Sequence, residues 1–134
     1  MNKIPKQKYF DKSVINKPWG YEYTVYRNKN KLNVTYLNIN PGEKTSLHCH
    51  YSKKTGFIVA SGKAKIQLGL YKRSSVTFSA PSKLMIRTGL FHQIENIGKK
   101  NLEIFEFENP SDKFDLIRFK DHYGRKGKNY ETTK

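Results

Sequence analysis

The chain has 134 residues, a formal net charge of +15 and one cysteine. This length suits a single domain with one core, and a lone cysteine excludes an intramolecular disulfide framework. No run approaches the ~20 apolar residues of a membrane-spanning helix, and the opening "MNKIPKQKYF" lacks the apolar stretch of a signal peptide, so we expect a cytoplasmic protein.

The predicted elements are short β-strands separated by turn residues, a pattern typical of a sandwich or barrel. Turn formers such as Pro41-Gly42 and Ala80-Pro81-Ser82 separate them. In chain order the predicted strands are 21–27, 32–39, 45–51, 55–62, 63–70, 74–80, 83–89, 91–97 and 101–108. The sequence therefore predicts an all-β fold.

The two ends of the chain differ from this β-rich region, 17–109. Residues 1–16 are polar and lysine-rich and predict an extended arm. Residues 110–134 predict a tail that packs on the barrel and begins with a short helical segment, for which Ser111 is the expected N-cap. The amphipathic pattern of this segment consists of Phe114, Leu116, Ile117 and Phe119.

The large positive charge raises the question of nucleic acid. Most of it is lysine spread along the chain, without zinc-finger spacing, a basic helix or an aromatic RNA-binding motif. The charge therefore favours an anionic substrate, and we expect neither nucleic acid nor a membrane as a partner.

Three histidines predict a metal site. His48 and His50 are two apart on a predicted strand, so their imidazoles project to one face, and Cys49 between them is expected to be a small buried residue on the other. His92 lies in a second turn-then-strand segment. Three inward imidazoles would leave open positions for water or substrate. The alternative is three barrel-interior histidines that hold no metal.

Two motifs resemble those of the cupins. "PGEKTSLHCHYSKKTGFIVASG" is similar to the first cupin motif and "RTGLFHQIEN" to the second. More narrowly, "KPWGYEY", "INPGEKTSLHCH" and the tail "DLIRFKDHYGR" resemble the C-terminal cupin domain of bifunctional mannose-1-phosphate guanylyltransferase/mannose-6-phosphate isomerase enzymes and their stand-alone relatives. Together these stretches cover about residues 17–125.

The resemblance implies a single-domain cupin jelly-roll β-barrel with a divalent metal near its mouth. His48, His50 and His92 fall on the ligand positions; zinc is the expected metal, with iron, nickel and manganese as alternatives. The acidic ligand of the family falls at position 55, where this chain has Thr55, and Arg87 replaces a proline of the second motif.

The resemblance also implies a sugar-phosphate isomerase that acts on a phosphorylated sugar or nucleotide sugar in surface-polysaccharide synthesis. An aldose–ketose isomerase needs a base that moves a proton between two carbons, and the candidates are Glu106 and Glu43. For Glu106 the alternative is a solvent-facing strand carboxylate, because both faces of its strand carry apolar residues.

Basic residues near the predicted mouth are candidates for binding phosphate. They are Arg87, Lys44, Lys53 and Lys54, and Tyr51 is a candidate for bonding a sugar hydroxyl. Arg118, Asp121, Tyr123 and Arg125 are expected to latch the tail, and Trp19 and Gly20 to pack at the entry strand.

Two other functions remain open. One is a non-catalytic cupin that binds a phosphosugar, and the other is a three-histidine oxygenase. For each of the three functions we expect a homodimer.

Overall fold

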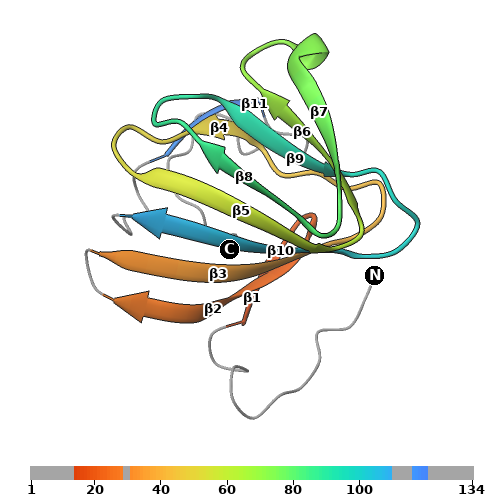
Figure 1. The fold of residues 1–134 in the computed structure, drawn as a ribbon, viewed down its shortest axis with the longest axis horizontal. Helices are drawn as coiled ribbons and strands as arrows, with labels where there is room; N and C mark the ends of the chain where they lie inside the picture. The colour runs from red at the N-terminus through yellow and green to blue at the C-terminus, as the bar shows by residue number, and fades with distance from the viewer. Residues whose placement is uncertain (1–13, 29–30, 110–115, 121–134) are drawn as a thin grey trace.

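A computed structural model describes residues 14–28, 31–109 and 116–120. The described residues form eleven strands and one short 3-10 helix, η2 (Lys72–Ser74) (Figure 1). The strands are β1 (Val14–Lys17), β2 (Gly20–Asn28), β3 (Leu32–Ile39), β4 (Leu47–Cys49), β5 (Lys54–Ser61), β6 (Lys63–Leu68), β7 (Ser75–Ser79), β8 (Ser82–Ile86), β9 (His92–Asn96), β10 (Leu102–Asn109) and β11 (Ile117–Lys120).

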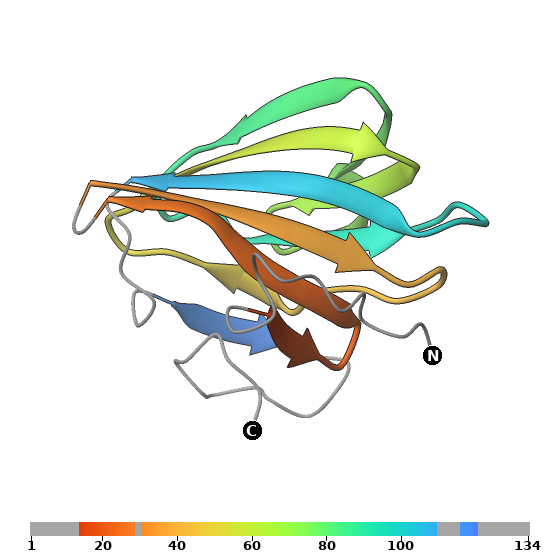
Figure 2. The ribbon, with the colours of Figure 1, turned by 90° about the horizontal axis from the view of Figure 1, so that it is seen from below.

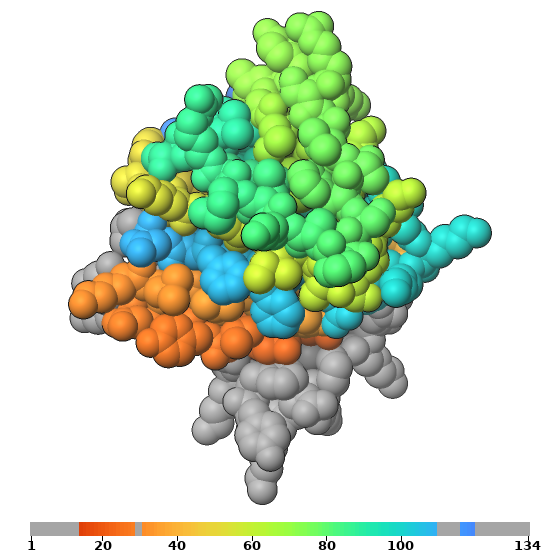
Figure 3. All heavy atoms as spheres, viewed as in Figure 1, coloured from red at the N-terminus to blue at the C-terminus, as the bar shows by residue number. Residues whose placement is uncertain are grey.

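The strands form two antiparallel sheets. One runs β1-β2-β3-β10-β5-β8 and the other β11-β4-β9-β6-β7. Figures 1 and 2 show the two layers from directions 90° apart. In the space-filling view of Figure 3, side chains fill the spaces that the ribbons leave on the face shown. The predicted all-β class is confirmed, and every predicted strand has a counterpart within a few residues.

The space between the sheets is apolar towards one end and polar towards the other. On β10, Leu102 and Ile104 are completely buried in the core, and the same strand face continues into Glu106 and Glu108. Phe105 takes the opposite face, where its ring packs edge-on against Tyr36 at 5.5 Å. Alternation therefore carries one strand from hydrophobic core into a polar interior.

The predicted helical segment of the tail is wrong in its described part. Residues 117–120 form β11, which pairs with β4. Leu116 and Arg118 are buried whereas Ile117 and Phe119 are exposed, which is the two-residue period of a strand. Ser111 and Phe114 lie outside the described residues. No helix in the described ranges is long and apolar enough to cross a membrane.

The entry strand forms a hairpin that depends on Gly20. β1 pairs with β2 from Val14 to Lys17, so the last residues of the predicted arm form a strand. A Cβ at Gly20 would lie 2.0 Å from the carbonyl oxygen of Asn38, and the φ of +155° is unusual for other residues. The close approach of β2 to β3 therefore requires glycine. The division into arm, barrel and tail stays a prediction.

Candidate metal centre and the adjoining cavity

The structure brings the three predicted histidines together. His48 on β4 and His92 on β9 are direct cross-strand partners, and His50 follows β4 on the same face as His48. Their ring centroids are 4.6–5.4 Å apart. One ring nitrogen from each lies within 4.8 Å of the others. The pairing of β4 with β9, which alternation alone does not reveal, places the third imidazole beside the first.

Backbone carbonyls fix two of these imidazoles in a form that binds metal. His48 Nδ1 lies 2.9 Å from the carbonyl oxygen of Ser46, and His92 Nδ1 lies 3.0 Å from that of Leu90. Because a carbonyl oxygen only accepts, each Nδ1 donates its proton and each Nε2 presents a lone pair. Together with a ring nitrogen of His50, the two converge in a way that suits a divalent ion such as zinc.

The electrostatics of the cluster also keep His48 neutral. Burial lowers the pKa of His48 well below its usual value, and the neighbouring His92 and His50 lower it further. Arg118 acts in the same direction, whereas the hydrogen bond to Ser46 opposes it. A neutral imidazole is the form that ligates metal, so metal does not have to displace a proton from His48 near pH 7.

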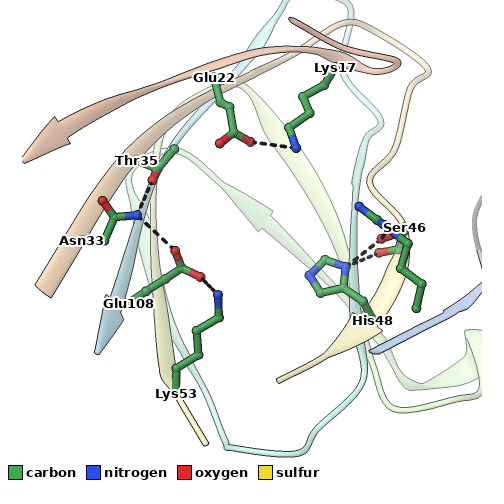
Figure 4. Close-up of polar contacts among 9 residues, drawn as sticks. Lys17, Glu22, Asn33, Thr35, Ser46, His48, Lys53 and Glu108 are labelled. Carbon is green, nitrogen blue, oxygen red and sulfur yellow. Dashed lines mark hydrogen bonds and ion pairs between the residues drawn. The ribbon is translucent and has the colours of Figure 1, made fainter. Parts of the chain in front are cut away.

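Thr55 lies in the barrel interior beside a buried ion pair. The residue is 1% exposed and stands opposite Glu108 in the register of β5 and β10. Its hydroxyl makes no hydrogen bond within the described chain. The Glu108 carboxylate lies 2.5 Å from Lys53 Nζ and accepts a 3.3 Å hydrogen bond from Asn33 Nδ2 (Figure 4). Lys53 was expected at the mouth, but its side chain is completely buried.

A cavity adjoins His48 and His92 between the sheets. Its lining is partly apolar and partly polar, and four charged side chains from both ends of the described chain contribute to it. The charged residues are Lys17, Glu22, Glu106 and Arg118. The other lining residues are Trp19, Leu37, Thr45, Ser46, Phe57, Ile94 and Leu116.

Glu106 lies in this cavity because of its place on β10. It stands opposite Thr35 of β3 and Phe57 of β5, two inward residues, and shares its strand face with buried Ile104 and Glu108. The aromatic residues of β10 occupy the outer face. Of the two predicted bases, Glu106 is the one that lines the cavity.

The other predicted site residues lie elsewhere. Tyr51 is 64% exposed, and Lys54 and Arg87 are exposed as well. Lys44 is half-buried and forms a β-bridge with Glu95, while the backbone of the half-buried Glu43 bonds that of Asn96. Within the described chain these five residues do not line the cavity, and their binding or catalytic roles stay predictions.

Sequence reasoning missed three charged residues of the cavity. Lys17 and Glu22 flank the turn of "KPWGYEY" and form a 3.7 Å ion pair, with side chains 3% and 11% exposed. Arg118, expected to latch the tail, is buried, and its Nε donates to Ser46 Oγ at 3.3 Å. The two motifs that contain these residues, "KPWGYEY" and "DLIRFKDHYGR", were interpreted as packing elements. The charged residues within them were the signal that could have indicated a binding role.

Comparison with known proteins places this chain in a family. The sequence profile described as mannose-6-phosphate isomerase C-terminal matches residues 5–121. Mannose-1-phosphate guanylyltransferase of Escherichia coli K12 is 30% identical over 114 residues, covering 83% of this chain and 23% of the relative. Xanthan biosynthesis protein XanB of Xanthomonas campestris is 29% identical over 113 residues, with the same coverage. The chain thus spans under a quarter of these relatives.

Solved structures share the fold. The capsular polysaccharide assembling protein CapF of Staphylococcus aureus superimposes with a TM-score of 0.70 and 21% identity, over 80% of this chain and 34% of that one. At this identity the likeness concerns the fold alone. The predicted cupin jelly-roll is confirmed.

Proposed function

The chain belongs to the family of mannose-6-phosphate isomerase C-terminal domains, and from this premise we propose that its cavity isomerises a phosphorylated sugar between aldose and ketose with the help of a divalent metal. The observation that carries the proposal is that two of the three clustered imidazoles, those of His48 and His92, line the same cavity as the carboxylate of Glu106. A role in nucleotide-sugar and surface-polysaccharide synthesis is supported by the names of two relatives, mannose-1-phosphate guanylyltransferase and xanthan biosynthesis protein XanB.

The histidines would hold the metal. His48, His50 and His92 fit such an ion because Nδ1 of two of them is directed to backbone carbonyls and the ring nitrogens converge. When bound, a divalent ion polarises a carbonyl oxygen and lowers the cost of the oxyanion that develops during enolisation.

Glu106 is the residue to which we assign the proton transfer. Isomerisation requires a base that removes a proton from one carbon and returns it to the next. Glu106 lines the cavity together with Leu37, Phe57 and Ile94, apolar side chains that lower the local polarity around a transferred proton. Glu22 is held by Lys17 and serves as a fixed counter-charge.

A second candidate function is phosphosugar binding without catalysis. It is favoured by Thr55, a buried hydroxyl at the position where a carboxylate is expected, with no hydrogen bond to another described residue. In this case the cavity binds the same class of ligand but does not turn it over.

The test combines metal analysis with an isomerase assay on mannose 6-phosphate. We expect about one divalent metal per chain, lost in His50→Ala. Glu106→Gln should keep the metal and lower kcat by roughly 100-fold or more, as expected for removal of a general base. Glu43→Gln is the matched control and should leave kcat unchanged, because Glu43 lies outside the cavity lining.

One outcome would contradict the isomerase, and another would contradict the assignment of Glu106 as its base. If metal-free protein binds mannose 6-phosphate tightly and metal-loaded protein does not isomerise it, the protein is a binding cupin. If Glu106→Gln retains the kcat of the wild type, the proton is carried by another group.

A further inference from the structure

We propose that Lys17 and Arg118 form the subsite for the phosphate group of the ligand, so that the cavity selects phosphorylated over neutral sugars. The inference rests on the proposed function only in taking the ligand to be a sugar phosphate. It replaces the exposed residues Arg87 and Lys54, which the sequence had suggested, with two buried cations from opposite ends of the chain.

Lys17 and Arg118 both line the cavity, so an anion bound there could contact them. Lys17 ends β1 and Arg118 lies on β11, and both line the same cavity as His48 and His92. The Lys17 side chain is 3% exposed and Arg118 is 6% exposed. Burying a cation costs free energy that only a nearby anion or strong hydrogen bonds can offset. In Figure 4 the Lys17 ammonium points towards the interior with the Glu22 carboxylate beside it.

Arg118 is also tied to the metal centre. Its Nε donates to Ser46 Oγ at 3.3 Å, and the same hydroxyl lies 2.9 Å from His48 Nδ1. One serine therefore sets both the guanidinium and an imidazole ligand. This arrangement suits a small molecule whose anionic group and reacting carbonyl enter the cavity together. Guanidinium is well matched to such a ligand because it presents a planar set of donors to phosphate oxygens.

The charges of the cavity lining point to the same ligand. Lys17 and Arg118 balance Glu22 and Glu106, so these four residues sum to zero. A divalent ion at the histidines adds two positive charges. A phosphate monoester carries about −1.5 to −2 at neutral pH and would offset them. A neutral sugar would leave the excess positive charge uncompensated in this partly apolar cavity.

The exposed alternatives lack these features. Lys54 and Arg87 are exposed and lie outside the cavity lining. Surface charges are screened by water and salt, so each contributes little to the affinity for a small anion. They serve as matched controls, because Lys54 can be given the same substitution as Lys17, and Arg87 the same substitution as Arg118.

The test is calorimetric titration of zinc-loaded protein with mannose 6-phosphate, mannose and inorganic phosphate. Lys17→Met and Arg118→Lys should each weaken binding of mannose 6-phosphate by about 10- to 100-fold, the loss expected for a charge-assisted hydrogen bond. Binding of mannose should change less than about 2-fold. Lys54→Met and Arg87→Lys should leave all three affinities as in the wild type.

A further variant guards against misfolding. Lys17→Met removes the ion-pair partner of Glu22, so Lys17→Met/Glu22→Gln removes both charges together and should show the same selective loss while melting as the wild type does. The proposal is overturned if the Lys17 and Arg118 variants bind mannose 6-phosphate as the wild type does, or lose mannose equally. Isomerisation with unchanged KM in both variants would overturn this subsite alone. Selective binding through Lys17 and Arg118 without turnover would overturn only the isomerase.

Discussion

Replacing Lys53 by methionine should destabilise the fold more than any surface substitution. Methionine keeps the length of the side chain but removes the ammonium that lies 2.5 Å from Glu108. Both side chains are 0% exposed, so water cannot solvate the carboxylate that remains. Removing one partner of a buried ion pair costs about 3–5 kcal/mol, against a total stability of about 5–15 kcal/mol for a domain.

The double variant distinguishes the cost of leaving one buried charge unpaired from the cost of changing the side chain at position 53. In Lys53→Met/Glu108→Gln no charge remains, and the Gln carbonyl can still accept from Asn33 as Glu108 does at 3.3 Å. Replacing a buried pair by neutral groups of similar volume is often neutral or stabilising, so we expect the double variant within about 1 kcal/mol of the wild type.

The assay is urea unfolding followed by the fluorescence of Trp19, the one tryptophan, which is 4% exposed. Chelator is present throughout, so metal binding does not add to the apparent stability. The exposed neighbour Lys54→Met should stay within about 0.5 kcal/mol of the wild type. The reasoning is refuted if Lys53→Met loses under about 1 kcal/mol, or if the double variant is as unstable as the single.

Four further predictions concern other parts of the barrel. Burial raises the pKa of Tyr36, and its hydrogen bond to Glu103 raises it further. The tyrosine therefore ionises at lower pH in the unfolded state than in the folded state, and the free energy of unfolding should fall as pH rises above about 10. Tyr36→Phe should reduce this pH dependence in urea titrations from pH 8 to 11. Gly20→Ala should cost about 1–3 kcal/mol in thermal melts, because its Cβ would lie 2.0 Å from a carbonyl of β3. Gly42→Ala, with φ +81° and open space around it, should cost about 1 kcal/mol. Thr55→Val should be neutral within about 0.5 kcal/mol in urea unfolding, because its hydroxyl makes no hydrogen bond in the described chain; a loss above 1 kcal/mol would show that the hydroxyl has a partner after all.

Alternation and turn residues were sufficient to predict most strands but not the two at the ends. β1 has only four residues, "VINK", too few for a period to show. In the tail, Leu116, Ile117 and Phe119 fit a helical period as well as a strand, and pairing with β4 decides between them. β1 depends on a chain reversal that pairs it with β2, and β11 depends on β4, which lies far away in the sequence. Local patterns encode neither pairing.

The candidate site likewise contains residues that local patterns predict and residues that only the tertiary fold brings together. His48 and His50 share a strand face by parity, so their convergence could be predicted from two positions alone. For Glu106 parity was ambiguous, because each face of β10 carries apolar residues; the structure shows that the outer face packs Phe105 against Tyr36. Lys17 and Arg118 were missed because their role depends on bringing both ends of the chain to one cavity.

That last arrangement has a consequence during synthesis. Ser46 accepts its bond from Arg118, 72 positions later, and Lys17 comes from the opposite end of the described chain. As the protein emerges from the ribosome, all three histidines of the cluster have been synthesised once β9 is made. Arg118, the last of the four charged side chains that line the cavity, is synthesised only with β11. A nascent chain would thus contain all three clustered histidines before it contains the complete proposed phosphate subsite, and β11, the last of the described strands, would complete the cavity lining.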